Sequence, residues 1–425
     1  MTLFYTIGIA LFSFAVRIAS LFNPKAKLFV AGRKNIFAEI AGKVGPTDQP
    51  VWFHFASLGE FEQGRPVLEA LKVKHPDEKI VVTFFSPSGY EIRKNYTGAD
   101  AIFYLPIDTA ANARRFVRLV RPKMAIFTKY EFWHHYFKAL YQAGTPLFLI
   151  SGIFRPQQIF FKSYGGFNRR ILGYVSHFFV QNEESVQLLH RIGLNNVTLS
   201  GDTRFDRVYA HAQHPQQLPL IADFCGDAPV LVAGSTWPDD EKLLAGLASA
   251  HPGWKFIIAP HEIHEPHIAA VKRLFPGSIL FSQLADATGA RPTTHTPQTV
   301  HLKPYTPSLK PQILIIDNIG MLSSLYQFGK VAYIGGGFGV GIHNTLEAAA
   351  FGLPVIFGPE YDKFQEAKDL IALGAAQSIS NANELNTAFE QFEGDEQAGA
   401  KAKAYVADKK GATAQILNRI DFILH

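Results

Sequence analysis

The chain of 425 residues contains a single cysteine, Cys225. One thiol excludes a disulfide framework and any metal cluster held by several thiolates, and it is typical of a reducing compartment. Charged residues are also scarce, at 18%, whereas apolar residues make up 47%. Such a composition supplies enough apolar side chains for buried cores and is unlike that of a disordered chain. The length predicts two or three domains.

The formal net charge of +5 is concentrated at one end of the chain. Residues 1–48 contain six lysines and arginines against two acidic residues, so this segment alone carries a net charge of +4. The remainder is close to balance, which argues against the continuous basic face of a nucleic-acid-binding protein. We therefore expect no nucleic acid partner.

The segment Leu3–Phe22 is almost wholly apolar and is interrupted only by Arg17. It approaches the roughly 20 residues that span a bilayer. A signal peptide fits poorly, because a charged region before the apolar run and a small-residue cleavage site are not evident. Basic residues that favour anionic headgroups on the cytoplasmic side follow at once: Lys25, Lys27, Arg33 and Lys34. We predict that residues 1–24 associate with a membrane, spanning it or lying in its plane; a buried first helix is the alternative.

Short apolar runs alternate with polar or amphipathic segments through the rest of the chain. Runs of about five residues without strict alternation are typical of strands buried on both faces of a parallel sheet. The pattern therefore predicts an α/β fold with doubly wound sheets. The first series is Val51–Phe55, Ile80–Phe85, Ala101–Leu105, Met124–Thr128, Leu147–Ile150 and Phe178–Gln181, and the second is Val230–Ala233, Lys255–Ala259, Ile313–Ile316, Val331–Ile334 and Pro354–Gly358.

These two series predict two Rossmann-like domains, 25–206 and 230–405, with a ligand cleft between them. Residues 207–229 lack a clear pattern and contain three prolines, so we expect a linker there. Residues 406–425 are expected to form a C-terminal helix that packs back on the first domain. Residues 284–312, rich in proline and threonine, are expected to form an exposed excursion.

Two acidic residues follow predicted strands, where ligands of open α/β sheets collect. Glu60 comes after a turn that Gly59 would permit, near the start of a helix whose dipole favours an ionised carboxylate. Such a group can act as a general base, although a purely electrostatic role in the first helical turn remains open. Glu131 follows Met124–Thr128 and is either functional or part of a surface turn. His134 and His135 are poor candidates for a shared metal, because adjacent side chains point in different directions.

A glycine-rich loop, 335–341, follows the predicted strand Val331–Ile334 and leads into an alanine-rich helix. It has neither the G-x-G-x-x-G spacing nor the lysine of a P-loop. Backbone amides at such a place still bind phosphate, which makes Gly336 and Gly337 candidates. Asn344 and Glu347 match the N-cap and N3 positions of a capping-box-like start, a role compatible with nucleotide contact.

The histidines that follow the strand Lys255–Ala259 suggest a metal site only superficially. His261 and His264 are three residues apart rather than the four of the zinc-protease pattern, and Pro266 disfavours a helix through them. We expect no metal, and instead a histidine that donates to an anionic ligand. Ser235 and Thr236 follow Val230–Ala233 and offer hydroxyl groups, either to a ligand or as a helix cap.

Taken in order, these motifs give the sequence a family resemblance. It resembles the 3-deoxy-D-manno-octulosonic acid (Kdo) transferases of lipopolysaccharide assembly, collinearly over the whole chain. Each motif alone is modest, and the ordered series is specific. The series is H-x-x-S-L-G-E (His54–Glu60), Y-E-F-W (Tyr130–Trp133), Q-N-E-E (Gln181–Glu184), G-D-T-R-F-D (Gly201–Asp206), A-G-S-T (Ala233–Thr236), I-G-G-G to H-N-T-L-E-A-A-A (Ile334–Ala350) and P-V-I-F-G-P (Pro354–Pro359).

The resemblance implies a GT-B glycosyltransferase that moves Kdo from CMP-Kdo, a substrate, to the lipid A precursor with inversion, without metal or cofactor. It also implies the cytoplasmic face of the inner membrane as the location. Glu60 falls on the family's catalytic base, and Glu131 falls on the second carboxylate of its E-x-E-x-W motif. The implied donor-binding residues are Ser235, Thr236, His261, Gly336, Gly337, Asn344 and Glu347. The implied contacts to acceptor phosphates or lipid headgroups are Lys27, Arg33, Lys34, Arg155 and Arg204.

Several positions depart from the family pattern, chiefly on the donor side. Lys129 stands where the family has its first glutamate, and Trp237 replaces a histidine. The P-R-H-P motif reads Pro260–Ile263 here and lacks its arginine. These changes leave three rival functions open: a GT-B transferase that uses another nucleotide sugar, a non-catalytic membrane-bound protein that binds one, and a metal hydrolase.

Overall fold

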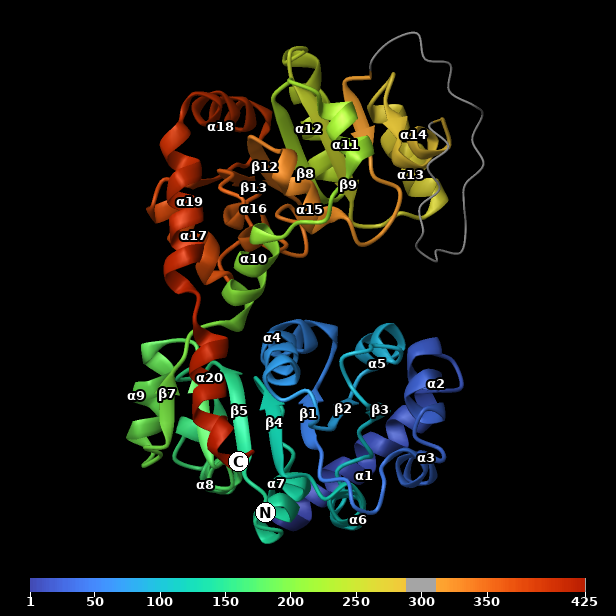
Figure 1. Ribbon diagram of the computed structural model, residues 1–425, viewed down its shortest axis with the longest axis vertical. Helices are drawn as coiled ribbons and strands as arrows, with labels where there is room; N and C mark the ends of the chain where they lie inside the picture. The colour runs from blue at the N-terminus through green and yellow to red at the C-terminus, as the bar shows by residue number, and fades with distance from the viewer. Residues whose placement is uncertain (288–310, 425) are drawn as a thin grey trace. The chain divides into compact units, whose positions relative to one another are not determined.

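The computed structural model describes residues 1–287 and 311–424, which fall into two compact units (Figure 1). The first unit comprises Met1–Asp206 together with residues 410–424, and the second comprises Arg207–Lys409. Each unit is built around one seven-stranded sheet in which every pair of neighbouring strands is parallel. This is the doubly wound α/β architecture that the apolar runs predict.

The sheet of the first unit has the strand order β3-β2-β1-β4-β5-β6-β7. Its central strand β1 pairs with β2 on one side and β4 on the other, so that Val51 lies beside both Ile80 and Met124. Every residue of β1, β2 and β4 is buried, which explains why these strands appear in the sequence as continuous apolar runs. The strands are β1 (Val51–Phe55), β2 (Ile80–Phe84), β3 (Ala101–Tyr104), β4 (Met124–Thr128), β5 (Leu147–Gly152), β6 (His177–Val180) and β7 (Val197–Leu199).

Helices cover both faces of this sheet and bury two apolar clusters, one on each face. One cluster contains side chains of α4 and α20, and the other contains side chains of α3, α6, α7, α8 and α9. The helices of the unit are α1 (Thr2–Ala19), α2 (Pro24–Ala31), α3 (Ile36–Lys43), α4 (Leu58–Lys74), α5 (Pro87–Arg93), α6 (Ala110–Val120), α7 (His134–Gln142), α8 (Gly166–Leu172), α9 (Glu183–Arg191) and α20 (Ala412–Ile420), with short 3-10 turns at Ile159–Phe161 and Asp421–Ile423.

The first helix, α1, is long and apolar enough to cross a membrane by length and composition, which is weak evidence taken alone. It lies against the first unit through one face only. The Tyr5 hydroxyl donates to Asp108 at 2.6 Å, Thr6 lies 3.1 Å from Nε2 of His135, and the Phe12 ring stacks on Phe85. The opposite face exposes large apolar side chains to the surroundings: Leu3, Phe4, Ile7, Leu11, Phe14 and Ile18. The helix therefore turns Tyr5 and Thr6 toward the unit together with Phe12, while its outward face is made of large apolar side chains, unlike the polar outer face of a helix in a soluble protein.

The second unit has the strand order β10-β11-β9-β8-β12-β13-β14. Its strands are β8 (Val230–Thr236), β9 (Lys255–Pro260), β10 (Ile279–Leu280), β11 (Ile313–Ile315), β12 (Val331–Ile334), β13 (Val355–Phe357) and β14 (Ala376–Ser378). Its helices are α10 (Thr203–Gln213), which begins in the first unit, α11 (Pro219–Cys225), α12 (Pro238–Ala250), α13 (Glu265–Leu274), α14 (Phe281–Ala287), α15 (Leu322–Leu325), α16 (Thr345–Ala350), α17 (Gln365–Ala372), α18 (Ala382–Gly394) and α19 (Glu396–Lys409), with a 3-10 turn at Tyr326–Phe328.

The structure differs from the sequence-based expectations in three places. Residues 207–229 are not an extended linker, because they contain the end of α10 and the whole of α11 and belong to the second unit. Gly59 does not form a tight turn; it lies within α4, and a Cβ there would find its nearest neighbour at 3.8 Å. Most of the segment 284–312, expected to be an exposed excursion, lies outside the described residues.

The C-terminal helix α20 packs against α4 and completes the core of the first unit (Figure 1). We therefore expect Ile420→Ala to destabilise the first unit by about 2–5 kcal/mol, the range for truncating a buried isoleucine, because Ile420 is 0% exposed. Phe422→Ala is the matched control, since Phe422 is 65% exposed. Urea unfolding followed by amide hydrogen exchange in β1 and α4 measures the effect. Equal stabilities of the two variants would show that α20 does not contribute to this core.

Candidate active site

The carboxyl ends of the strands in the first unit bring acidic side chains together with polar and aromatic groups. Glu60 is the third residue of α4, whose N-cap is Ser57. The Ser57 hydroxyl donates its hydrogen bond to the Glu60 carboxylate. Glu60 is only partly buried, and it lies in the first turn of a 17-residue helix, close to the positive end of the helix dipole. The helix start expected at this residue is confirmed.

Glu131 lies beyond the end of β4 and is held by two ring nitrogens. The indole Nε1–H of Trp133 donates to Oε2 of Glu131 at 2.8 Å, and Nε2 of His54 lies 3.2 Å from the same oxygen. The Glu131 side chain is 16% exposed and His54 is fully buried in β1. The carboxylate is therefore held by one residue of the sheet, His54, and by one residue that follows it in the chain, Trp133.

A chain of hydrogen-bonding side chains within the sheet connects Trp52 to Glu131 through Thr83 and His54. Trp52 Nε1–H donates to the Thr83 hydroxyl at 2.8 Å, and that hydroxyl lies 2.9 Å from Nδ1 of His54. The Thr83 hydroxyl also lies 3.4 Å from the Phe53 carbonyl oxygen, to which it can donate. Both ring nitrogens of His54 therefore have a polar partner, and Nε2 fixes the position of the Glu131 carboxylate.

The turn between β4 and Glu131 is conformationally unusual. Lys129 has a positive φ of 58°, a conformation that costs energy in a residue with a side chain and tends to occur at functional sites. Tyr130 follows and is 38% exposed. Burial raises the pKa of Tyr130, while the charge of Arg155 lowers it and that of Glu60 raises it.

The N-terminal basic residues do not play equivalent roles in the structure. Arg33 donates to the backbone carbonyls of Phe29, Phe85 and Leu105, at 2.6–2.9 Å, and so ties α2 to the ends of β2 and β3. Burial lowers the pKa of Arg33 to about 9, which leaves the group protonated at neutral pH. Lys27 and Lys34, in contrast, are exposed.

Arg204, the remaining basic residue implied by the resemblance, forms a local ion pair. Its Nε and terminal nitrogen bind the Asp202 carboxylate at 2.8 and 2.7 Å. Asp202 also accepts from the Arg204 backbone amide, so the pair stabilises the start of α10. The structure thus gathers Lys27, Arg33 and Lys34 around α2. Arg155 belongs to a different part of the unit, where its charge lowers the pKa of Tyr130.

In the second unit, the glycine-rich loop lies at the carboxyl ends of three neighbouring strands. A Cβ on Gly335 would lie 2.3 Å from the Ser235 carbonyl oxygen, and one on Gly337 would lie 2.6 Å from the Gly358 backbone. These glycines therefore permit the ends of β8, β12 and β13 to approach closely. Several loop amides are used internally, since Gly339 and Gly341 both donate to the Gly336 carbonyl. Any phosphate contact thus involves only part of the loop's amides.

Asn344 caps helix α16, as the sequence predicts. Its Oδ1 accepts from the Leu346 amide and its Nδ2 donates to Glu347 at 3.0 Å. Glu347 also pairs with Arg207 at 3.1 Å, and its side chain is 19% exposed. The carboxylate is thus fixed in place and still reachable from solvent.

A buried acidic pair supports this loop from behind. Asp240 accepts from the amides of Trp237 and Gly336 and from the Tyr333 hydroxyl, all within 2.7–2.9 Å. Burial raises the pKa of Asp240, and these donors oppose the rise. Its neighbour Glu241 accepts from the Thr236 hydroxyl at 3.0 Å. Thr236 is fully buried, so its hydroxyl is directed into the protein, whereas Ser235 is half-buried and has a positive φ of 55°.

Three aromatic rings gather at the same end of the sheet. The His261 ring stacks on Trp237 and on His343, with centroid distances of 4.9 and 4.5 Å. The Trp237 indole donates to Nε2 of His343 at 3.1 Å. Burial lowers the pKa of His343 to about 4, so at neutral pH the ring is uncharged and accepts this bond. Trp237 therefore belongs to this group of rings. The sequence showed only that it replaces a family histidine and did not indicate this role.

The histidines near His261 are engaged in separate contacts. His264 caps α13 and lies 3.0 Å from Glu262, and His267 lies 3.0 Å from the buried Glu241. Within residues 1–287 and 311–424, no three histidine, cysteine or acidic side chains are arranged to hold a metal ion.

The close approach at Gly337 predicts a position-specific cost of adding a methyl group. We expect Gly337→Ala to destabilise the second unit by about 1–3 kcal/mol, as overpacking does, because backbone atoms of Gly358 block the space. Gly339→Ala is the control, since a Cβ there has no neighbour within 4 Å. Calorimetric unfolding of both variants measures the difference. A Gly337→Ala protein as stable as the control would mean that the two strand ends separate without cost.

Comparisons with known proteins show which proteins this chain is similar to. Residues 31–207 match the family model described as 3-deoxy-D-manno-octulosonic-acid transferase (kdotransferase), a range that includes both Glu60 and Glu131. The 3-deoxy-D-manno-octulosonic acid transferase of Aquifex aeolicus is 26% identical over 79% of this chain and 84% of its own length. That of Bordetella pertussis is 26% identical over 88% of both chains.

Solved structures agree on the fold. The chain resembles a UDP-GlcNAc 2-epimerase from Neisseria meningitidis with a TM-score of 0.56 and 15% identity, over 86% of this chain and 96% of that one. It resembles the glycotransferase of kitacinnamycin with a TM-score of 0.52 and 13% identity, over 89% of this chain and all of that one. The architecture is GT-B, and the chain is similar to the 3-deoxy-D-manno-octulosonic acid transferases over most of its length.

Proposed function

We propose that the protein transfers Kdo from CMP-Kdo to a lipid A precursor of the lipid IVA type, with inversion at the anomeric carbon and without a metal ion. The observation that carries the proposal is Glu60, a partly exposed carboxylate in the first turn of α4, within the residues that match the Kdo transferase family. The two-unit GT-B fold and the relatives named above support the same activity.

The proposed step requires a base and an oriented acceptor. Glu60 takes the proton from the acceptor 6-hydroxyl while that oxygen bonds to the anomeric carbon of Kdo. The bond from this carbon to the CMP phosphate oxygen breaks, and the electron pair leaves with CMP. Attack opposite the leaving group inverts the configuration. The base must be an ionised carboxylate, and Glu60 lies in the first turn of α4, where the helix dipole interacts favourably with negative charge.

Glu131 acts beside the base in this proposal. Because Trp133 donates to Oε2 and Nε2 of His54 lies 3.2 Å from the same oxygen, the carboxylate keeps one orientation. Positive charge develops on the sugar as its bond to CMP breaks, and a fixed carboxylate stabilises it without reorganisation. His54 is then a positioning residue that acts through Glu131.

The second unit is the proposed donor-binding unit. The fixed Glu347 carboxylate and the partly exposed Ser235 offer polar groups to the nucleotide, together with the uncommitted amides near Gly337. His261 is exposed, although its ring stacks on both Trp237 and His343, and we propose that it donates to the donor phosphate. We assign no cofactor, because CMP-Kdo is itself the substrate.

The membrane surface is the proposed location, on its cytoplasmic face. Since one face of α1 is packed against the first unit through Tyr5 and Thr6, we propose that the helix lies in the membrane plane rather than across it. The outward apolar face would then enter the acyl boundary, where a lipid acceptor is presented.

The direct test is to incubate purified protein with CMP-Kdo and the lipid A precursor and to follow product mass by mass spectrometry. The proposed function predicts the addition of Kdo and the release of CMP. A UDP-sugar in place of CMP-Kdo serves as the comparison, because it tests the rival transferase. Product from the UDP-sugar alone, or from neither donor, would contradict the proposal.

We predict that Glu60→Gln abolishes transfer while the fold and donor binding are retained. Glutamine keeps the size of the side chain but cannot accept the proton, and a general base contributes about 10²–10⁴-fold in rate. Glu184→Gln is the matched control, since Glu184 is also a first-turn acid of a helix in the same unit. Turnover at saturating donor and acceptor measures the loss. If Glu60→Gln keeps more than about a tenth of the wild-type rate, far above the range for a lost base, Glu131 becomes the candidate base.

We also predict that charge on the outward face of α1 releases the protein from membranes. Leu11 and Phe14 are each 63% exposed on this face. Burial of such a side chain contributes about 1.5–3 kcal/mol, so Leu11→Glu/Phe14→Glu should weaken vesicle binding at least about a hundredfold. Val73→Glu is the control, because Val73 is 83% exposed on α4. Unchanged sedimentation of the double variant with vesicles would exclude the in-plane arrangement.

A further inference from the structure

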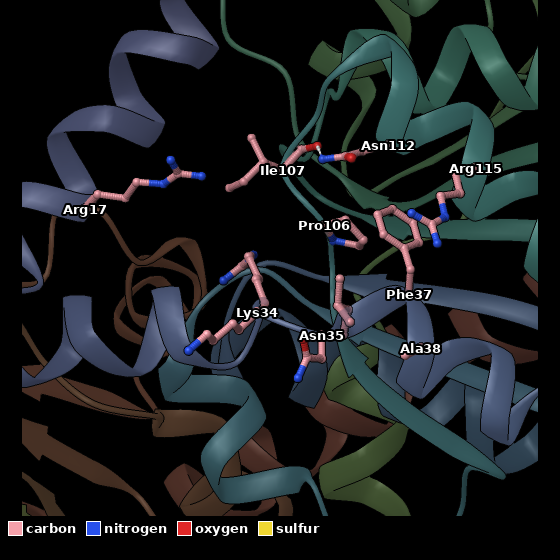
Figure 2. A pocket seen from close by; sticks show the side chains of 11 residues that line it. Arg17, Lys34, Asn35, Phe37, Ala38, Pro106, Ile107, Asn112 and Arg115 are labelled. Carbon is pink, nitrogen blue, oxygen red and sulfur yellow. Dashed lines mark hydrogen bonds between the residues drawn. The ribbon is translucent and has the colours of Figure 1, made fainter.

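A cavity of about 390 Å³ opens in the first unit where α1, the turn after α2 and the loop after β3 meet. Figure 2 shows Arg17 reaching in from α1 and Arg115 reaching in from α6 on the other side, with Lys34 and Asn35 between them. The volume lies in the range of small-molecule sites. None of the carboxyl-end residues Glu60 and Glu131 lines this cavity.

The charge around the cavity has one sign. Arg17, Arg33, Lys34 and Arg115 line it, and none of its lining residues is acidic. In the part of the chain that the structure describes, Arg17, Lys34 and Arg115 have no carboxylate within 4.0 Å. Four cations without a counter-ion repel one another, and an anion placed between them removes that repulsion.

Two of these cations have well-defined orientations. The Arg115 guanidinium lies 4.4 Å from the centre of the Phe37 ring, which fixes its planar group at the cavity wall. Arg33 is held beneath the cavity by its three carbonyl contacts and lies 3.6 Å from the centre of the Phe29 ring. The positive wall is therefore partly preorganised, which lowers the cost of ordering side chains on binding.

An apolar groove continues from the cavity. A second cavity of about 550 Å³ shares Arg17, Arg33 and Lys34 with the first. Apolar side chains of α1, α2 and the loop after β3 form much of its wall, namely Val16, Phe29, Val30, Ala31 and Ile107. The rest of the wall is polar and consists of Ser13, Ser20 and Lys27. A cationic chamber that opens into an apolar groove matches a molecule with an anionic head and an acyl tail.

We propose that this cavity binds the headgroup phosphate of an anionic membrane phospholipid, whose acyl chain follows the groove beside α1. A lipid is favoured over free phosphate because α1 itself forms the wall, and the outward face of α1 is apolar along its length. The site would fix the height and rotation of the first unit on the membrane. It goes beyond the proposed sugar transfer and does not depend on it.

The test compares two double variants that remove the same charge. Lys34→Ala/Arg115→Ala empties the cavity wall, whereas Arg114→Ala/Arg118→Ala removes two arginines of α6 that line a different cavity. Binding of the full chain is measured to phosphatidylcholine vesicles with and without phosphatidylglycerol, in the absence of any sugar nucleotide. From the contribution of a basic residue near an anionic surface, we expect about a fivefold loss for each cation removed from the cavity.

A loss confined to Lys34→Ala/Arg115→Ala and to vesicles with phosphatidylglycerol would support the site. Equal losses in both double variants would show general attraction and overturn it, as would equal binding to the two kinds of vesicle. Inorganic phosphate could also remove the preference for phosphatidylglycerol while the membrane binding that depends on α1 stays intact. That result would assign the cavity to the free ion. If Lys34→Ala/Arg115→Ala raises the KM for the acceptor in phospholipid-free detergent, the cavity binds the acceptor and not a membrane phospholipid. Lys34→Ala alone, an exposed change, keeps the test valid if the double variant fails to fold.

Discussion

The organisation of this protein depends on strands that are buried on both faces. A side chain with a charge cannot be accommodated along such a strand unless it is paired, so polar groups gather where the strands end. His54 and His177 are buried on strands of the first sheet, and each has polar partners: Thr83 and Glu131 for His54, and Thr198 for His177. The acidic groups of the candidate site therefore lie at the carboxyl ends of the strands.

The same constraint explains what could be predicted from the sequence. The buried central strands were located to within one to three residues, because each is a continuous apolar run. The strands that escaped prediction are β7, β10 and β14, which lie at or next to the sheet edges and are two or three residues long. Such strands bury fewer side chains, so they leave little hydrophobic signal in the sequence.

The candidate site could be predicted in part. Glu60 and Glu131 were found because each directly follows a strand or its turn, and Asn344 because its position before α16 matches a capping pattern. The role of Trp237 in the ring stack was not predictable, since its partners come from two other loops. The arginines of the basic cavity, Arg17 and Arg115, are separated by nearly a hundred residues, and only the fold brings them together.

Arg33 illustrates how one residue can connect several parts of the fold. Its guanidinium joins the ends of β2 and β3, and the Phe85 ring above it lies 4.7 Å from the Trp133 ring. Trp133 in turn donates to Glu131. The wall of the basic cavity is thereby linked to the candidate catalytic carboxylate through three consecutive contacts.

The placement of α20 has a consequence for the order of folding during synthesis. The first unit needs Ile416 and Ile420 to close the cluster over α4, yet the ribosome makes these residues only after the whole of the second unit. At about 5–20 residues per second, the open core waits for at least about ten seconds. During that time the apolar surface of α4 is uncovered, so the unit made first is completed last.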